Sequence, residues 1–116
     1  MNAPRLPNAE QATVPIEKLR DYALDPEHPR GQHKARVFRS TLGIGQDDWE
    51  YLREQILEAV PSAAVATVRV ISWGTLCEVP ILVEGLNGET HEVTTVWIVE
   101  RDDDPPKLVT TYVNVP

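Results

Sequence analysis

The stretch 75-TLCEVPILVEGLNGETHEVTTVWIVE-100 gives the clearest indication of the fold. In both of its halves the hydrophobic pattern has a period of two, which is typical of β-strands. The tetrapeptide Leu86-Asn87-Gly88-Glu89 lies between the halves, and Asn-Gly is the dipeptide that suits a type I′ turn. The stretch is therefore predicted to form a β-hairpin with strands at 75–84 and 90–100.

Two further strands are predicted on either side of this hairpin, at 65–72 and 107–115. All three links between the strands are short, including the acidic, proline-containing turn at 101–106. Short links favour antiparallel neighbours, so the predicted topology is a meander. In the last strand one face is expected to pack against the core, with Val109, Thr111, Val113 and Val115. The other face is more polar, with Leu108, Thr110, Tyr112 and Asn114.

The first half of the chain has helical spacing instead of strand spacing. Helices are predicted at 15–25, which must end before Pro26, at 32–42, which Gly43 ends, and from Asp47 to about residue 60. The predicted fold class is therefore α+β, with two to three N-terminal helices packed on a four-stranded antiparallel β-meander.

The length of 116 residues fits one domain, predicted at 14–116 and preceded by a flexible N-terminal lead at 1–13. The single Cys77 excludes an internal disulfide, which fits a reducing compartment. No apolar run is long enough to span a bilayer, and the N-terminus lacks the apolar core of a secretion signal. We therefore expect a cytoplasmic protein that does not contact membranes.

The charge is acidic overall but uneven along the chain. The net charge of −7 argues against general nucleic-acid binding, because phosphate contacts need clustered Lys and Arg. However, residues 29–46 contain no acidic residue and include Arg30, Lys34, Arg36 and Arg39. This segment is either a local anion-binding patch or a solvated helix face.

One set of side chains could carry chemistry. It comprises His28, His33, Lys34 and Arg36 in the loop and second helix, with Thr110 and Tyr112 on the last strand. A His can transfer protons near neutral pH, Lys and Arg stabilise charge on a phosphate, and hydroxyls orient it. These residue types are what a metal-free ribonuclease uses, although spacing alone does not show that they meet. No motif for a metal, a nucleotide phosphate loop or another cofactor is present, so none is expected.

Several motifs resemble those of a family of small bacterial domains of unknown function. The family pattern has LPNA, L-x-x-Y, HPxGxxKAxxF, LG, WIV and PxLVTxYV. Here these motifs are found at 6–9, 19–22, 28–38, 42–43, 97–99 and 106–113. The resemblance covers nearly the whole chain. Members occur alone and as C-terminal modules of large bacterial toxins, and their plan is similar to that of barnase–EndoU–colicin–RelE-like nuclease domains.

The resemblance implies two alternative functions. In the first, the chain is a metal-independent, toxin-type ribonuclease that cleaves RNA by His acid/base chemistry and is held by a small cognate inhibitor. His28 and Lys34 then match the family motif, Arg36, Thr110 and Tyr112 match the nuclease type of site, and His33 falls at a variable position. In the second, it is a non-catalytic binding module, antitoxin-like or immunity-like, whose acidic surface complements a basic toxin.

Overall fold

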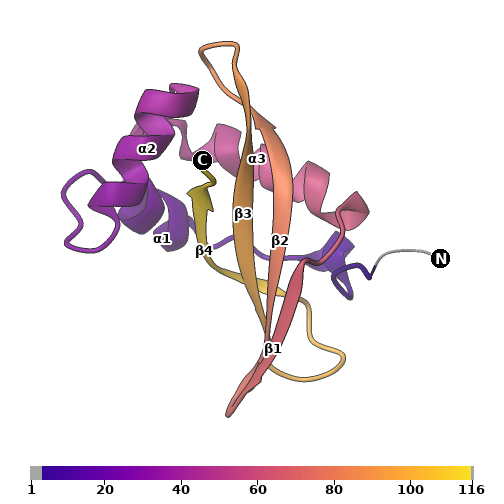
Figure 1. Cartoon of the computed structure of the whole chain (residues 1–116). Helices are drawn as coiled ribbons and strands as arrows, with labels where there is room; N and C mark the ends of the chain where they lie inside the picture. The colour runs from indigo at the N-terminus through magenta and orange to yellow at the C-terminus, as the bar shows by residue number, and fades with distance from the viewer. Residues whose placement is uncertain (1–3, 116) are drawn as a thin grey trace.

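A four-stranded antiparallel sheet forms the centre of the computed structural model, which describes residues 4–115 (Figure 1). The strands lie in the order of the sequence, β1 (Thr67–Ile71), β2 (Gly74–Glu84), β3 (Thr90–Val99) and β4 (Lys107–Val113). Each strand therefore pairs with its neighbour in the chain, as short links require. The predicted α+β class and meander topology are confirmed.

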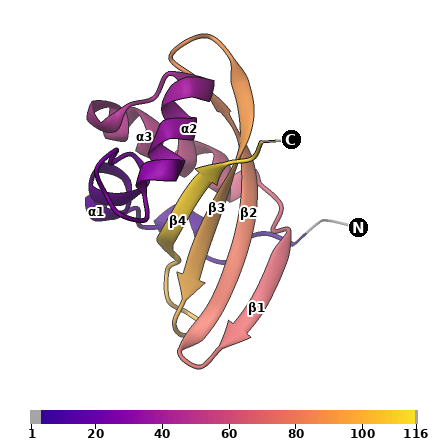
Figure 2. The same cartoon turned by 60° about the vertical axis from the view of Figure 1, so that its left-hand side comes forward.

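The helices cover one face of this sheet and leave the other face without a helix (Figures 1 and 2). The two longest, α2 (Gln32–Leu42) and α3 (Trp49–Ala59), have 11 residues each. Their buried side chains meet those of β2 and β3 in one core, whose largest members are Trp97, Phe38, Leu52, Ile56 and Val79. Short helices η1 (Ala9–Gln11), η3 (Gln46–Asp48) and η4 (Val60–Ser62) complete this layer. Within residues 4–115, no helix is long and apolar enough to cross a membrane.

The first predicted helix differs from a regular α-helix. It begins as the single turn α1 (Ile16–Lys18) and continues as the π-helical turn η2 (Leu19–Ala23). The wide turn is closed by the N–H of Leu24, which donates to the carbonyl of Leu19 at 2.8 Å, five residues earlier. Leu19 and Ala23 are both buried by this turn. Single π-turns are rare and often occur at functional sites.

A β-bulge in β4 contradicts the predicted faces at Leu108 and Val109, whereas Thr111 and Val113 are buried as predicted. Val115, which was also predicted on the packed face, is 61% exposed. Val96 of β3 pairs with Thr110, and the next residue, Trp97, pairs with Leu108, so Val109 is an extra residue without a partner. The bulge reverses the alternation of side chains, because one residue is inserted into a period of two. As a result Leu108 is fully buried, although it was predicted on the polar face, and Val109 is only half-buried.

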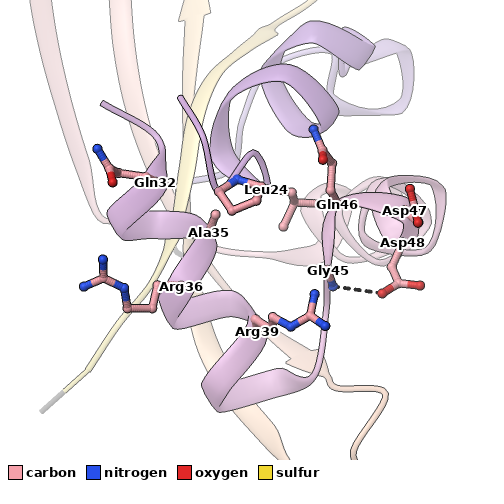
Figure 3. Close-up of a pocket in the computed structure, with 10 residues that line it drawn as sticks. Leu24, Gln32, Ala35, Arg36, Arg39, Gly45, Gln46, Asp47 and Asp48 are labelled. Carbon is pink, nitrogen blue, oxygen red and sulfur yellow. Dashed lines mark hydrogen bonds between the residues drawn. The ribbon is translucent and has the colours of Figure 1, made fainter. Parts of the chain in front are cut away.

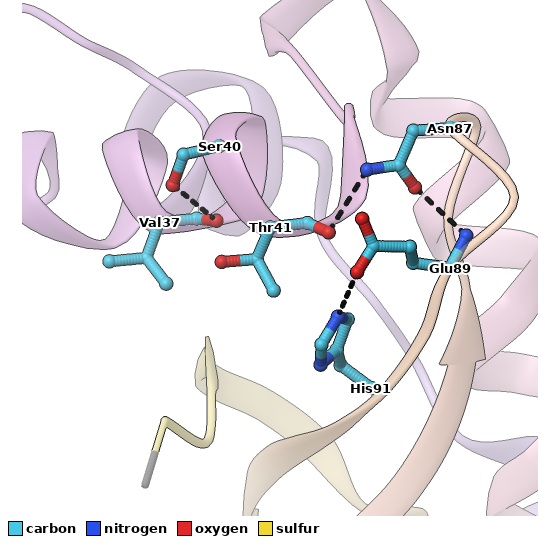
Figure 4. Close-up of polar contacts among 6 residues, drawn as sticks. All are labelled: Val37, Ser40, Thr41, Asn87, Glu89 and His91. Carbon is cyan, nitrogen blue, oxygen red and sulfur yellow. Dashed lines mark hydrogen bonds and ion pairs between the residues drawn. The ribbon is translucent and has the colours of Figure 1, made fainter.

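The turn between β2 and β3 docks on the end of α2 (Figure 4). Gly43 ends the helix in the left-handed conformation, with φ 66°. The Asn87 side chain donates a hydrogen bond to the carbonyl of Thr41 at 3.1 Å and accepts one from the N–H of Glu89 at 3.1 Å. The predicted hairpin turn therefore also fixes the position of α2 over the sheet.

The described part of the N-terminal segment, from Pro4 onward, packs against the sheet domain. Leu6 and Ala9 are buried, with 3% and 5% exposure. The backbone of Thr13 makes two hydrogen bonds of 2.9 Å with the start of β4, one with Pro106 and one with Leu108. The sequence prediction set 1–13 apart as a lead because of its Pro and Asn residues. The structure instead uses residues 4–13 to cover one end of the core.

Candidate active site

Tyr22, on the π-helical turn η2, receives contacts from two other segments. The Lys34 ammonium of α2 donates a hydrogen bond to the Tyr22 hydroxyl at 3.1 Å, and the same nitrogen lies 5.0 Å from the centre of the ring. A donor with a full positive charge makes a stronger hydrogen bond than a neutral one. Residues of the L-x-x-Y and HPxGxxKAxxF motifs therefore contact each other at this phenol.

The environment of Tyr22 lowers the pKa of its phenol below the ordinary value of 10.0. The main cause is the hydrogen bond from Lys34, which stabilises the phenolate, and the positive charges of Lys34 and Arg30 act in the same direction. Partial burial opposes this effect, because desolvation disfavours the charged form. The net result is a phenol with a pKa below 10.0.

The loop that carries the HPxG motif packs directly on Tyr22. The His28 ring meets the Tyr22 ring edge-on, with centroids 4.8 Å apart and planes at 82°. A Cβ atom at Gly31 would lie 1.9 Å from the Tyr22 carbonyl oxygen, so only glycine allows this approach. The motif glycine therefore has a packing role.

His28 also folds its own loop. Its Nδ1 accepts hydrogen bonds from the backbone N–H groups of Arg30 and Gly31, both at 3.0 Å. Nδ1 is thus unprotonated, and the neutral ring carries its proton on Nε2. Adding a proton to Nδ1 would break both loop hydrogen bonds, so this arrangement suits a positioning residue better than the acid/base expected from the sequence.

Thr110 on β4 completes the cluster from the sheet. Its Oγ1 is buried and has no hydrogen-bond partner among residues 4–115. The hydroxyl contributes to the lowered pKa of Tyr22, but it makes no hydrogen bond of normal geometry to the phenol. An unpaired buried hydroxyl is costly, and this one lies beside the Tyr22 phenol.

Tyr22, His28 and Thr110 line one cleft of about 580 Å³ between the first helical segment, the His28 loop and β4. Lys34 is not part of the cleft wall and is connected to it through the hydrogen bond to Tyr22. The walls of the cleft are formed by Glu17, Lys18, Asp21, Tyr22, His28, Arg30, Val109 and Thr110. The structure thus brings together His28, Lys34 and Thr110 of the predicted set. It adds Tyr22 and Arg30, which the sequence prediction did not include, although both lie within or beside the motifs.

The other three predicted residues lie elsewhere. His33 is exposed on α2, and Arg36 lines a second pocket on the far side of that helix, since two residues turn a helix by about 200° (Figure 3). The Tyr112 hydroxyl donates to Glu78 Oε2 at 3.5 Å, in a hollow that shares no residue with the Tyr22 cleft.

Within residues 4–115, no cluster of three or more His, Cys, Asp or Glu side chains could hold a metal ion. The one other histidine, His91 on β3, pairs with Glu89 at 3.1 Å (Figure 4).

Comparisons with known proteins identify a family and a similar fold. A solved structure, described as a contact-dependent growth inhibition toxin–immunity protein complex from Klebsiella pneumoniae 342, contains a chain with a TM-score of 0.69 and 15% identity. The match covers 94% of this chain and 98% of that one, and at this identity it shows the fold alone. No curated protein sequence matches. The model of a domain of unknown function, DUF6883, matches residues 5–115, and the chain belongs to that family.

Proposed function

We propose that the chain is a toxin-type ribonuclease whose catalytic pair is Tyr22 and Lys34. The observation that carries this proposal is the 3.1 Å hydrogen bond between Lys34 Nζ and a phenol whose pKa it lowers, in a cleft with a free buried hydroxyl. Perturbed groups gathered in a cleft are typical of catalytic sites. The fold shared with a chain of a toxin–immunity complex supports a toxin or an immunity role.

In the proposed reaction the RNA 2′-oxygen attacks the adjacent phosphorus and the bond from phosphorus to the 5′-oxygen breaks. The Tyr22 phenolate takes the proton of the 2′-hydroxyl, and the Lys34 ammonium gives a proton to the leaving 5′-oxygen. The products are a 2′,3′-cyclic phosphate and a 5′-hydroxyl. Proton transfer from Tyr22 to Lys34 along their hydrogen bond then restores both groups, so no step needs a metal.

The remaining cleft residues would bind the phosphate. Arg30 supplies a guanidinium, which matches two phosphate oxygens, and Thr110 donates its O–H to the charge that builds up in the transition state. His28 holds the loop on which Arg30 lies and leaves Nε2–H as a donor. The RNA substrate places the action of such an enzyme in the cytoplasm.

The test is cleavage of total RNA and tRNA with a chelator present. Wild type is expected to cleave and to leave 2′,3′-cyclic phosphate ends. Lys34→Met keeps the apolar stem of the side chain and should lose about 10²-fold or more in rate. Lys107→Met, an exposed lysine on β4, is the matched control and should retain the wild-type rate. Cleavage that Lys34→Met leaves intact would refute the proposed pair.

A second candidate function is the non-catalytic binding module. The exposed edge strand β1 and the turn after it favour it, because Val70 is 80% exposed, Trp73 is 69% exposed and Val68 is 61% exposed. Leu82, on the sheet face without helices, is also 69% exposed. Exposed apolar patches often mark protein interfaces. If wild type cleaves no RNA in the assay above, this alternative replaces the enzyme, and mixing with a basic toxin should then give a stable complex.

A further inference from the structure

A second pocket of about 570 Å³ lies beside α2 and is lined by Arg36 and Arg39 (Figure 3). It is bounded by α2, by the segment that follows η2 and by the start of η3. Leu24 and Ala35, both buried, form an apolar floor together with Pro26. Arg36 and Arg39 come from α2, and Asp47 and Asp48 come from η3.

Some polar side chains of this pocket form hydrogen bonds within the protein, and others form no ion pair with another described residue. Asp48 accepts a hydrogen bond from the Gly45 N–H at 2.8 Å, and Gln46 donates one to the Arg20 carbonyl at 2.7 Å. In contrast, Arg36, Arg39 and Asp47 form no ion pair within residues 4–115. Two unpaired guanidiniums thus stand one helical turn apart, in a chain whose net charge is −7.

The chemistry of the free groups identifies the class of ligand. Guanidinium groups bind phosphate in a bidentate manner, and an apolar floor accepts the flat face of a base. The carboxylate of Asp47 repels a phosphate but accepts N–H groups such as those on the edge of a base. A nucleotide has all three features, with its phosphate at Arg36 and Arg39 and its base over the exposed Pro26.

The position of the pocket links it to the Tyr22 cleft. Pro26 lines the pocket and His28 lines the cleft, so one short loop separates the two. Two residues of extended chain span at most about 7 Å, and therefore the two binding regions are neighbours along the molecular surface.

We propose that the Arg36–Arg39 pocket binds a nucleotide of the RNA strand that flanks the cleaved linkage. This inference rests on the proposed ribonuclease function and adds a binding subsite to it. Arg36 and Arg39 are substrate-anchoring residues here, and they take no part in proton transfer.

The test uses the full chain and a 2′-O-methyl RNA oligonucleotide, which cannot be cleaved because its 2′-oxygen has no proton. Binding is followed by fluorescence anisotropy at several salt concentrations. The variant Arg36→Gln/Arg39→Gln should bind at least tenfold more weakly, and the slope of its log Kd against log salt should fall by about 0.7, as expected for the loss of one phosphate contact on a single strand. The control Arg53→Gln/Arg69→Gln removes the same charge outside the pocket and should bind within twofold of wild type.

The outcomes separate this inference from the proposed function. Cleavage of RNA by wild type, with equal oligonucleotide binding by the pocket variant and the control, overturns the subsite and leaves the enzyme. Absence of cleavage, with binding lost only in the pocket variant, overturns the enzyme and supports the subsite as a nucleic-acid site. No binding of the oligonucleotide by wild type at low salt overturns the subsite.

Discussion

At the scale of single residues, the contact between Lys34 and Tyr22 explains why the HPxGxxKA segment has its spacing. Gly31 lets the loop touch the Tyr22 backbone, and Lys34, one helical turn later, reaches the Tyr22 hydroxyl. The buried Ala35 beside it leaves room for α2 to pack closely. The motif is therefore built around a phenol that lies outside the motif itself.

The lowered pKa of Tyr22 is testable by itself. Lys34→Met removes the largest cause of the shift while partial burial remains, so the pKa of Tyr22 should rise. The measurement is an NMR titration of ring-labelled tyrosine, with Tyr22→Phe to assign the signal. Wild-type cleavage should correspondingly increase with pH as Tyr22 ionises. A Tyr22 pKa that is the same in Lys34→Met and wild type would show that the hydrogen bond has no such effect.

At the scale of secondary-structure elements, β4 is the strand in which local pattern and structure disagree. Counting by twos placed Val109 in the core and Leu108 outside, and the bulge opposite Val96 and Trp97 reverses this order. The pattern gives no sign of a bulge, because the inserted residue is a valine like its neighbours. Because of the bulge, the consecutive residues Val109 and Thr110 both line the Tyr22 cleft.

The register of β4 gives a stability prediction. Leu108→Ala should lower the free energy of unfolding by about 2–5 kcal/mol, because the side chain is fully buried. Val109→Ala removes a half-buried side chain and should cost no more than about 1 kcal/mol. Urea denaturation of the two variants compares them directly. A larger loss for Val109→Ala would mean that the strand has no bulge and keeps simple alternation.

The positions of the helices and strands were predicted from the sequence better than the contacts between them. The bounds of α2, 32–42, agree with the prediction because Gly43 ends the helix, and the central hairpin lies where it was predicted. Its turn is not the expected type I′, because Gly88 has a positive φ of 85° and Asn87 does not. The π-helical turn was missed, since a wide turn has the same apolar spacing as an α-helix over five residues. The predicted site included Lys34 and Thr110 but not Tyr22, because the contacts of η2 with α2 and β4 form only in the folded chain.

At the scale of the whole molecule, the N-terminal segment closes the core. Val14, together with Leu6 and Ala9, belongs to the same buried cluster as Trp97. The segment also extends the sheet, because Thr13 bridges to Lys107 in a parallel arrangement. The domain therefore includes residues that the sequence composition placed outside it.

Removal of one side chain tests this extension of the domain. Leu6→Ala should lower the free energy of unfolding by about 2–5 kcal/mol, as expected for a leucine that is 3% exposed. The exposed Glu10→Ala in the same segment should change it by about 0.5 kcal/mol or less. Thermal or urea unfolding measures both. An equal, small effect of the two substitutions would mean that the segment detaches before the domain unfolds.

We expect the Tyr22 phenol, and not a hydroxyl elsewhere on the molecule, to drive RNA cleavage. The most direct measurement compares the cleavage rates of Tyr22→Phe and Tyr112→Phe in the presence of a chelator, after both variants are shown to be folded. Each substitution removes one phenolic oxygen, and Tyr112 lies on the uncovered face of the sheet, outside the cleft. The cleavage rate should fall by about 10²-fold or more in Tyr22→Phe and stay near the wild-type rate in Tyr112→Phe. A Tyr22→Phe variant that cleaves RNA as fast as Tyr112→Phe would contradict this expectation.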